Sequence, residues 1–205
     1  MSIRKSNFFI VTGGPGAGKT TLIEALGALG FRTVEEAGRR IIREQKAMGG
    51  NPTHDGDRLA YRDLMFEDAI RTFEEMTPAS GAVFFDRGLP DLIGYSRLIS
   101  ETASQALSNA VQRYRYNRTV FVAPPWEEIY KRDAERKQDF AEAVATCDAI
   151  RSAYEEAGYI LVDLPKTSVE KRVAFVLMRA QAGGTFVAQS GRTPGSMPKT
   201  RGPRR

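Results

Sequence analysis

The chain has 205 residues, of which 41% are hydrophobic and 27% charged, with 19 Gly and 10 Pro. This length suits one ordinary domain, and this composition excludes a collagen-like, disulfide-stapled or membrane-spanning chain. Five of the 30 Lys and Arg residues fall after residue 180, where no acid occurs, so the formal charge of +5 belongs to the tail and residues 1–180 are neutral.

Short apolar segments alternate along the chain with stretches of helical periodicity. We expect helices at Thr20–Leu29, Ala37–Met48, Asp55–Glu75 and Ser168–Ala182, with others between the later strands. The predicted strands are Asn7–Thr12, Arg32–Val34, Ala82–Asp86, Thr119–Ala123 and Tyr159–Asp163. Because these strands lack alternating polarity and are separated by helices, the sequence predicts a three-layer α/β fold around a five-stranded parallel sheet.

The predicted folded domain covers residues 1–182, and residues 183–205 form a basic tail. The tail is rich in Gly and Pro and poor in bulky hydrophobic residues, so we expect it to be disordered. Its charges leave open a contact with nucleic acid or another acidic partner, but a solvated extension is the simpler interpretation. No window approaches the ~20 apolar residues of a membrane span. With Cys147 as the single cysteine and no signal-peptide core, we expect a cytoplasmic protein without disulfides.

A glycine-rich segment follows the first predicted strand. Residues 13–20 read GGPGAGKT and match the pattern G-x-x-x-x-G-K-[ST]. Glycines allow backbone N–H groups to approach a polyphosphate, the next helix directs its positive end there, and Lys19 reaches the outer phosphates. The hydroxyl of Thr20 is then a ligand for Mg²⁺. The predicted nucleotide-binding residues are therefore Gly13, Gly14, Pro15, Gly16, Ala17, Gly18, Lys19, Thr20 and Thr21.

Asp86 and Arg87 end the third predicted strand. In a phosphate-binding protein of this kind, an aspartate at this place orients Mg²⁺ or takes a proton from an acceptor hydroxyl. The alternative is a turn aspartate that merely ends the strand. An Asp-Glu pair would suit hydrolysis of the nucleotide by water, whereas Asp86 followed by Arg87 favours transfer of the phosphoryl group to an acceptor.

Charged residues follow the second predicted strand. Parallel sheets place ligand groups just beyond the carboxyl ends of their strands, so Glu36 is a candidate for contact with an acceptor or metal. Arg40 is a further candidate for the acceptor, and Arg39 and Arg43 share one face of the following helix. Solvated helix charges paired with Glu36 and Glu44 explain the same pattern, and both interpretations stay open.

A second cluster of charges covers residues 126–137. Arg132 and Arg136 are four residues apart on a predicted helix and repel each other unless a negative group lies beside them. A nucleotide phosphate would serve, which makes this segment a candidate lid over the reacting group, with Arg136 as its catalytic arginine. An exposed helix with internal ion pairs is the equally acceptable alternative.

These motifs resemble a predicted ATP-binding family labelled AAA-type, which includes the ribosylnicotinamide-kinase half of the bacterial NAD regulator. The resemblance covers about residues 7–180 and includes the GGPGAGKT segment, FFDRGLPD at 84–91 and PPW at 124–126. It implies a P-loop fold close to nucleoside and nucleotide kinases. It does not imply a particular substrate.

From these residues we predict a Mg²⁺-ATP-dependent phosphotransferase that acts on a small hydroxyl-bearing, possibly nucleoside-like, acceptor. The predicted catalytic residues are Lys19, Asp86, Arg87 and Arg136, with Arg132 on the nucleotide, and Thr20 and Asp86 on the metal. The alternative is an ATPase or nucleotide-dependent switch with slow hydrolysis. The acceptor and the choice between ATP and GTP stay open.

Overall fold

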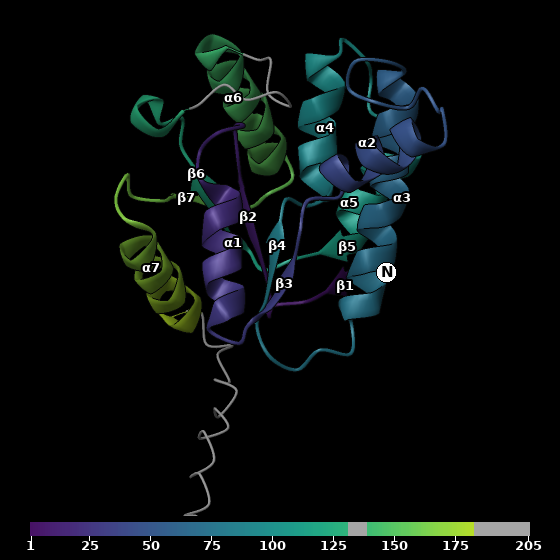
Figure 1. The fold of residues 1–205 in the computed structure, drawn as a ribbon. Helices are drawn as coiled ribbons and strands as arrows, with labels where there is room; N and C mark the ends of the chain where they lie inside the picture. Colours follow the sequence, from purple (N-terminus) through teal and green to yellow (C-terminus); the bar gives the residue numbers. More distant parts are fainter. Residues whose placement is uncertain (131–138, 183–205) are drawn as a thin grey trace, which may run out of the picture.

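A parallel five-stranded sheet forms the centre of the computed structural model, which describes residues 1–130 and 139–182 (Figure 1). The strand order is β3-β4-β2-β6-β7, and every neighbouring pair is parallel. These strands are β2 (Phe8–Gly13), β3 (Arg32–Val34), β4 (Val83–Asp86), β6 (Thr119–Ala123) and β7 (Ile160–Asp163). The predicted α/β fold with a five-stranded parallel sheet is therefore confirmed.

The strand β2 lies in the middle of this sheet, and all six of its residues are buried. Its register pairs Val11 with Asp86 on β4 and Gly13 with Ala123 on β6. The chain first builds the β4 side of β2 and then the β6 side, so the strand order reverses at β2. Ligands of parallel α/β sheets bind beyond the carboxyl ends of the strands at such a reversal.

Helices cover both faces of the sheet (Figure 1). They are α1 (Lys19–Ala28), α2 (Ala37–Ala47), α3 (Arg58–Met76), α4 (Leu89–Leu98), α5 (Gln105–Arg113), α6 (Phe140–Glu156) and α7 (Val169–Ala182), with a short 3-10 turn at Glu127–Ile129. Phe9 and Val11 of β2 belong to a core that includes α1 and α7. Phe8 and Ile10 point the other way, into a core that includes α3, α4, α5 and α6. This alternation explains why β2 is apolar throughout.

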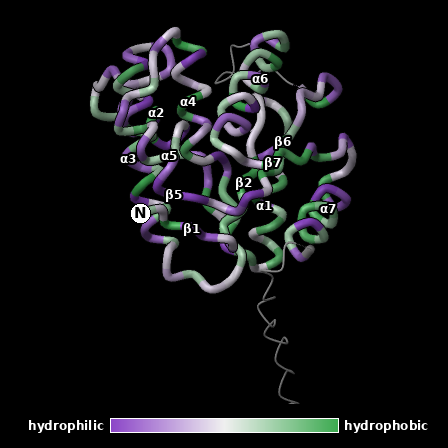
Figure 2. The backbone as a smooth tube through the Cα atoms, turned by 180° about the vertical axis from the view of Figure 1, so that it is seen from behind, coloured by the Kyte–Doolittle hydropathy of each residue, from purple (hydrophilic) through white to green (hydrophobic). Residues whose placement is uncertain are grey.

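The helices bury one side and expose the other, as their sequences require. Along α7 the colours in Figure 2 change between hydrophobic and hydrophilic, and Val173 and Val176 are buried while Lys171 is exposed. Cys147, the single cysteine, lies on the buried side of α6 at 1% exposure. Cores of this kind hold α1 and α7 against one face of the sheet and therefore fix where their first residues lie.

The structure refines two features of the sequence interpretation. Helix α3 begins at Arg58 rather than Asp55, because the Asp57 side chain caps it by accepting a 2.9 Å hydrogen bond from the Ala60 N–H. The short strands β1 (Ile3–Arg4) and β5 (Tyr114–Arg115) form a second, parallel pair that the sequence did not indicate. The predicted tail at 183–205 lies outside the described residues, among which no helix is long and apolar enough to cross a membrane.

Candidate functional site

A glycine-rich loop connects β2 to α1 at the carboxyl edge of the sheet. Gly13, Gly16 and Gly18 have φ values of 130°, 74° and 75°, which favour glycine over any residue with a side chain. A Cβ at Gly13 would also collide with the Ala123 carbonyl. Gly18 precedes α1, and no side chain of the described residues caps that helix. Its first N–H groups therefore remain available to an anion, in line with the predicted phosphate loop.

Lys19 is the first residue of α1 and lies against this loop. Its side chain is 6% exposed, and its Nζ donates a 2.8 Å hydrogen bond to the Gly14 carbonyl. Burial, with a smaller contribution from the Arg87 charge, lowers the pKa of Lys19 from 10.5 to about 8. The Lys19 ammonium is therefore largely shielded from solvent, and its attraction for a phosphate is stronger there than in water.

Asp86 ends β4 beside β2 and is 5% exposed. Its Oδ1 is buried and has no hydrogen-bond partner among the described residues. Burial raises the pKa of Asp86 from 3.8 to about 6, and Lys19 and Arg87 oppose this rise while Glu36 and Asp91 add to it. A buried carboxylate oxygen without a partner is rare in folded proteins, and such an atom calls for an explanation.

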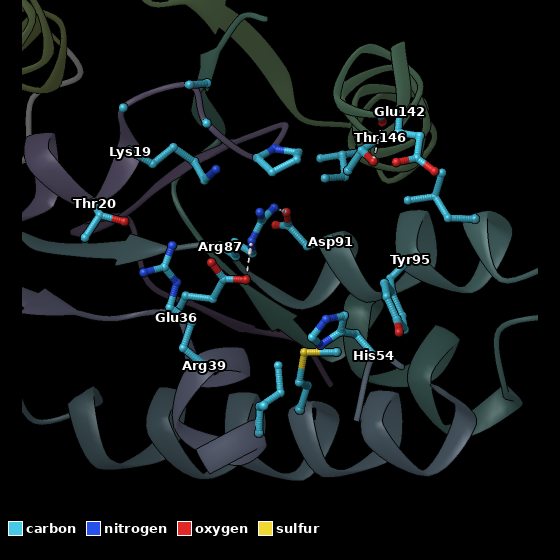
Figure 3. Close-up of a pocket in the computed structure, with 18 of the residues that line it drawn as sticks. Lys19, Thr20, Glu36, Arg39, His54, Arg87, Asp91, Tyr95, Glu142 and Thr146 are labelled. Carbon is cyan, nitrogen blue, oxygen red and sulfur yellow. Dashed lines mark hydrogen bonds and ion pairs between the residues drawn. The ribbon is translucent and has the colours of Figure 1, made fainter. Parts of the chain in front are cut away.

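Arg87 is held by several groups at the start of α4. Its Nε lies 2.9 Å from Glu36 Oε1, and its Nη1 lies 3.0 Å from Asp91 Oδ1 and donates to the Gly13 carbonyl at 3.1 Å. Its φ of 77° is unusual for a residue with a side chain. Although burial lowers the pKa of Arg87, the carboxylates of Glu36 and Asp91 raise it further, so the charge is permanent. Figure 3 shows these side chains close to Lys19.

Asp91 organises this cluster, although the sequence interpretation gave it no separate role. Its Oδ1 accepts a 2.5 Å hydrogen bond from the Thr12 hydroxyl, and its Oδ2 accepts from the Gly88 N–H at 2.9 Å and the Tyr154 hydroxyl at 2.6 Å. These donors lie on β2, before α4 and on α6. The sequence carried one signal of this, an acid three residues after Gly88 in the first turn of a helix.

Arg172 is a second residue of the candidate site that the sequence did not reveal. It lies on α7, is 4% exposed, and donates to the carbonyls of Ala17 at 3.1 Å and Gly18 at 3.5 Å. Burial lowers the pKa of Arg172. Because the N–H groups of a phosphate loop turn inward, its carbonyls turn outward and need donors. No local pattern on α7 distinguishes this arginine from surface cations.

The acceptor candidates after β3 separate into two groups. Glu36 is one-third exposed and pairs with Arg87; although burial raises the pKa of Glu36, the Arg87 and Lys19 charges lower it, and the net shift is downward. Arg40 instead pairs with Glu44 at 3.0 Å and Asp68 at 2.5 Å and does not line the cleft described below. The arginines of α2 that do line the cleft are Arg39 and Arg43.

The charged residues Lys19, Glu36, Arg87, Asp91 and Arg172 line one cleft of about 1520 Å³, and Asp86 precedes Arg87 without lining the cleft itself. One end is formed by the predicted phosphate-binding residues Pro15, Gly16, Ala17, Gly18, Lys19, Thr20 and Thr21. The other end lies between α2, α3 and α4, where Figure 3 shows His54 and Tyr95 beyond Glu36 and Asp91 as seen from Lys19. Arg132 and Arg136, the two predicted lid arginines, lie outside the described residues.

A glycine-rich loop between a central strand and a helix, with Lys19 at the start of that helix and Asp86 at the end of the neighbouring strand β4, defines the P-loop class of proteins. The chain belongs to the AAA domain family, whose sequence profile matches residues 8–172. A search of the curated proteins finds no significant match.

Solved structures with low sequence identity share the fold. NadR protein in complex with NR is 18% identical with a TM-score of 0.57, over 92% of this chain and 53% of that chain. Deoxyadenosine kinase from M. mycoides is 11% identical with a TM-score of 0.55, over 85% of this chain and 98% of that chain. Thymidylate kinase from Ehrlichia chaffeensis is 15% identical with a TM-score of 0.53, over 86% of this chain and 100% of that chain.

Proposed function

We propose that this protein is a Mg²⁺-ATP-dependent phosphotransferase that acts on a small, hydroxyl-bearing acceptor. The observation that carries the proposal is the buried Asp86 carboxylate, which faces the Lys19 and Arg87 charges next to an uncapped helix start. This arrangement suits a transferring phosphoryl group, which needs positive charge on its oxygens and a carboxylate near its acceptor or metal.

At the nucleotide end of the cleft, a small number of groups would bind the phosphates. The N–H groups of residues 13–19 and the start of α1 hold the phosphates, and Lys19 neutralises the outer ones. Arg172 fixes the outer side of the loop through the Ala17 and Gly18 carbonyls. Arg87 adds a permanent charge at the side of the loop where the acceptor enters. We retain Arg132 as a proposed nucleotide contact and Arg136 as a proposed catalytic arginine.

The unpartnered Oδ1 of Asp86 fits a metal ligand or the partner of a metal-bound water, and Thr20 lines the cleft together with Arg87, the residue that follows Asp86. Asp86 and Thr20 would hold Mg²⁺, which when bound supplies charge neutralisation on the phosphate oxygens. Because the pKa of Asp86 is about 6, its carboxylate is mostly ionised near neutral pH. It is therefore also suited to accept the proton of the attacking hydroxyl, a role for which Glu36 is the second candidate.

Two features favour transfer to an acceptor over hydrolysis by water. Asp86 is followed by Arg87 rather than by an acid, and the cleft extends well beyond the phosphate loop to α3 and α4. The fold is shared with proteins named as kinases of a deoxynucleoside and a nucleotide. These names support a nucleoside-like acceptor as the first class to test.

The experiment is incubation of the full chain with γ-labelled ATP, Mg²⁺ and a pool of small metabolites, followed by separation of labelled products. We expect a phosphorylated metabolite whose formation is lost in Asp86→Asn and Lys19→Ala. Arg118→Gln serves as the control, because Arg118 is exposed before β6, at the opposite edge of the sheet. ATP binding with only slow release of inorganic phosphate would instead support the nucleotide-dependent switch.

A further inference from the structure

The end of the cleft away from the phosphate loop has an apolar wall. Met65 from α3, Leu92 and Tyr95 from α4 and Ile99 directly after α4 line it, and the Tyr95 ring makes an edge contact with Tyr61 at 6.0 Å between centroids. Two polar atoms at this end, His54 Nδ1 and the Tyr95 hydroxyl, are buried without a partner among the described residues. This end therefore offers both an apolar surface and unused hydrogen-bonding groups.

A row of cations faces this wall from α2. Arg39, Arg43 and Lys46 line the cleft and are spaced four and three residues apart, which puts them on one face of the helix. Arg43 and Lys46 lie about 6 Å and about 10.5 Å beyond Arg39 along the helix axis. Arg39 helps to lower the pKa of Glu36, so the row begins beside the reacting groups and leads away from them.

The acids that line the cleft form no described ion pair with Arg43 or Lys46, since each of these acids contacts another group. Glu36 pairs with Arg87, and Asp91 accepts hydrogen bonds from four groups. Asp55 lies 3.4 Å from His54 Nε2, and Glu142 accepts a 3.0 Å hydrogen bond from the Asp139 N–H. Among the described lining residues there are seven cations, namely Lys19, Arg39, Arg43, Lys46, Arg58, Arg87 and Arg172, against those four acids.

This excess is specific to the cleft, since residues 1–180 carry equal numbers of acids and bases. Elsewhere on α2 and α3 the cations have acidic partners: Arg40 pairs with Glu44 and Asp68, and Arg71 with Asp68 and Glu75. Arg43 and Lys46 form no ion pair with any residue that the structure describes. Solvated surface charges would be expected to show the same local pairing on both faces of α2.

We infer that the phosphoryl acceptor carries an oxyanion, a phosphate or a carboxylate, which binds to Arg43 and Lys46 while the rest of the acceptor packs on Tyr95 and Leu92. This inference rests on the proposed function, because it assigns the α2–α4 end of the cleft to the acceptor. The acceptor hydroxyl then points toward Asp86 and Glu36, and the oxyanion lies one to two helical turns away along α2.

The test is calorimetric titration of the full chain, saturated with Mg²⁺ and a non-hydrolysable ATP analogue so that the phosphate loop is filled. The probes are matched pairs that differ in one anionic group: a nucleoside against its 3′-monophosphate, and shikimate against its methyl ester. We expect the charged member of at least one pair to bind at least about tenfold tighter, the effect of one to two charge-assisted hydrogen bonds. The pair that responds distinguishes phosphate from carboxylate.

The double variant Arg43→Gln with Lys46→Gln should lose this preference, while the Arg118→Gln control should keep it. Both substituted residues are exposed, so the fold is expected to survive, and unchanged binding of the ATP analogue verifies this. Equal binding of charged and neutral probes, or a preference that persists in the double variant, would overturn the inference. If charged probes bind as expected but no acceptor is phosphorylated in the labelled-ATP experiment, the proposed function fails and the oxyanion site remains.

Discussion

The hydroxyl of Tyr154 donates a 2.6 Å hydrogen bond to Asp91 Oδ2, which joins α6 to the first turn of α4 directly behind the phosphate loop. Both residues are buried, with Tyr154 at 0% and Asp91 at 4% exposure. Asp91 in turn contacts Arg87 and Thr12, so this bond connects a helix on one side of β2 to the charges of the site.

Tyr154→Phe should therefore destabilise the fold without changing the nucleotide contacts. Loss of a hydrogen bond to a carboxylate costs about 1.5–3 kcal/mol of unfolding free energy. The measurement is urea unfolding near neutral pH, compared with Tyr159→Phe, whose hydroxyl accepts only a 3.4 Å contact from the Tyr116 N–H. If Tyr154→Phe unfolds at the parent's urea midpoint, Asp91 does not depend on this donor.

Lys19→Ala should bind the ATP analogue about 10- to 150-fold more weakly, because a charge-assisted contact of about 1.5–3 kcal/mol is lost. The parent protein should also show a pH dependence. Since the pKa of Lys19 is about 8, affinity should be level below that pH and fall above it, as the free protein loses the proton that binding requires.

Calorimetry across this pH range checks the assignment. The Lys19→Ala variant should be weak at every pH and lack the fall above pH 8. A parent protein whose affinity is level to pH 10.5 would show that Lys19 keeps its ordinary pKa and is not in a dry site.

Asp86→Asn should make the protein without nucleotide more stable while abolishing phosphoryl transfer. The pKa of Asp86 is about 6 in the fold against an ordinary 3.8, so the folded chain binds more protons than the unfolded chain between these pH values. Ionised Asp86 therefore costs stability, in full above pH 6, and the cost disappears toward pH 3.8. The gain for Asp86→Asn near neutral pH is about 1–3 kcal/mol.

Urea unfolding at several pH values measures this difference. The stabilisation by Asp86→Asn should shrink as the pH falls from 6 toward 3.8, because the parent Asp86 then gains its proton. A variant that is less stable than the parent near neutral pH would mean that the carboxylate has a partner in the folded protein.

Arg172→Met should weaken binding of the ATP analogue by about tenfold, since two carbonyls of the phosphate loop lose their donor and a nearby charge is removed. Lys171→Met is the matched control, because Lys171 is adjacent on α7 but exposed. Arg172→Lys should restore part of the affinity by returning the charge without the paired donors. Equal affinities for Arg172→Met and Lys171→Met would show that α7 does not position the loop.

Local sequence patterns predicted the parts of this molecule that local physics determines. The strands Arg32–Val34 and Thr119–Ala123 were predicted with the bounds that the structure shows. The glycine-rich loop could also be predicted from the sequence, since only glycine adopts the positive φ values of Gly16 and Gly18 without strain. Predictions of this kind need no knowledge of the rest of the fold.

The residues that sequence reasoning missed depend on contacts between distant elements. Arg172 reaches a loop that precedes it by more than 150 residues, and it does so only because α7 packs on the same sheet face as α1. Asp91 and Tyr154 meet because α4 and α6 pack side by side on the other face. The pairing of β1 with β5 likewise joins two-residue segments that have no strand pattern of their own.

The left-handed backbone of Arg87 has a consequence for how this protein can change. Glycine would suit that φ better and would ease the backbone by about 1 kcal/mol. The same replacement would leave the Glu36 and Asp91 carboxylates without their cation, which costs about 3–5 kcal/mol for a buried pair and outweighs that relief. The strained turn is therefore maintained by its ion pairs, and libraries screened only for heat resistance are expected to retain this arginine.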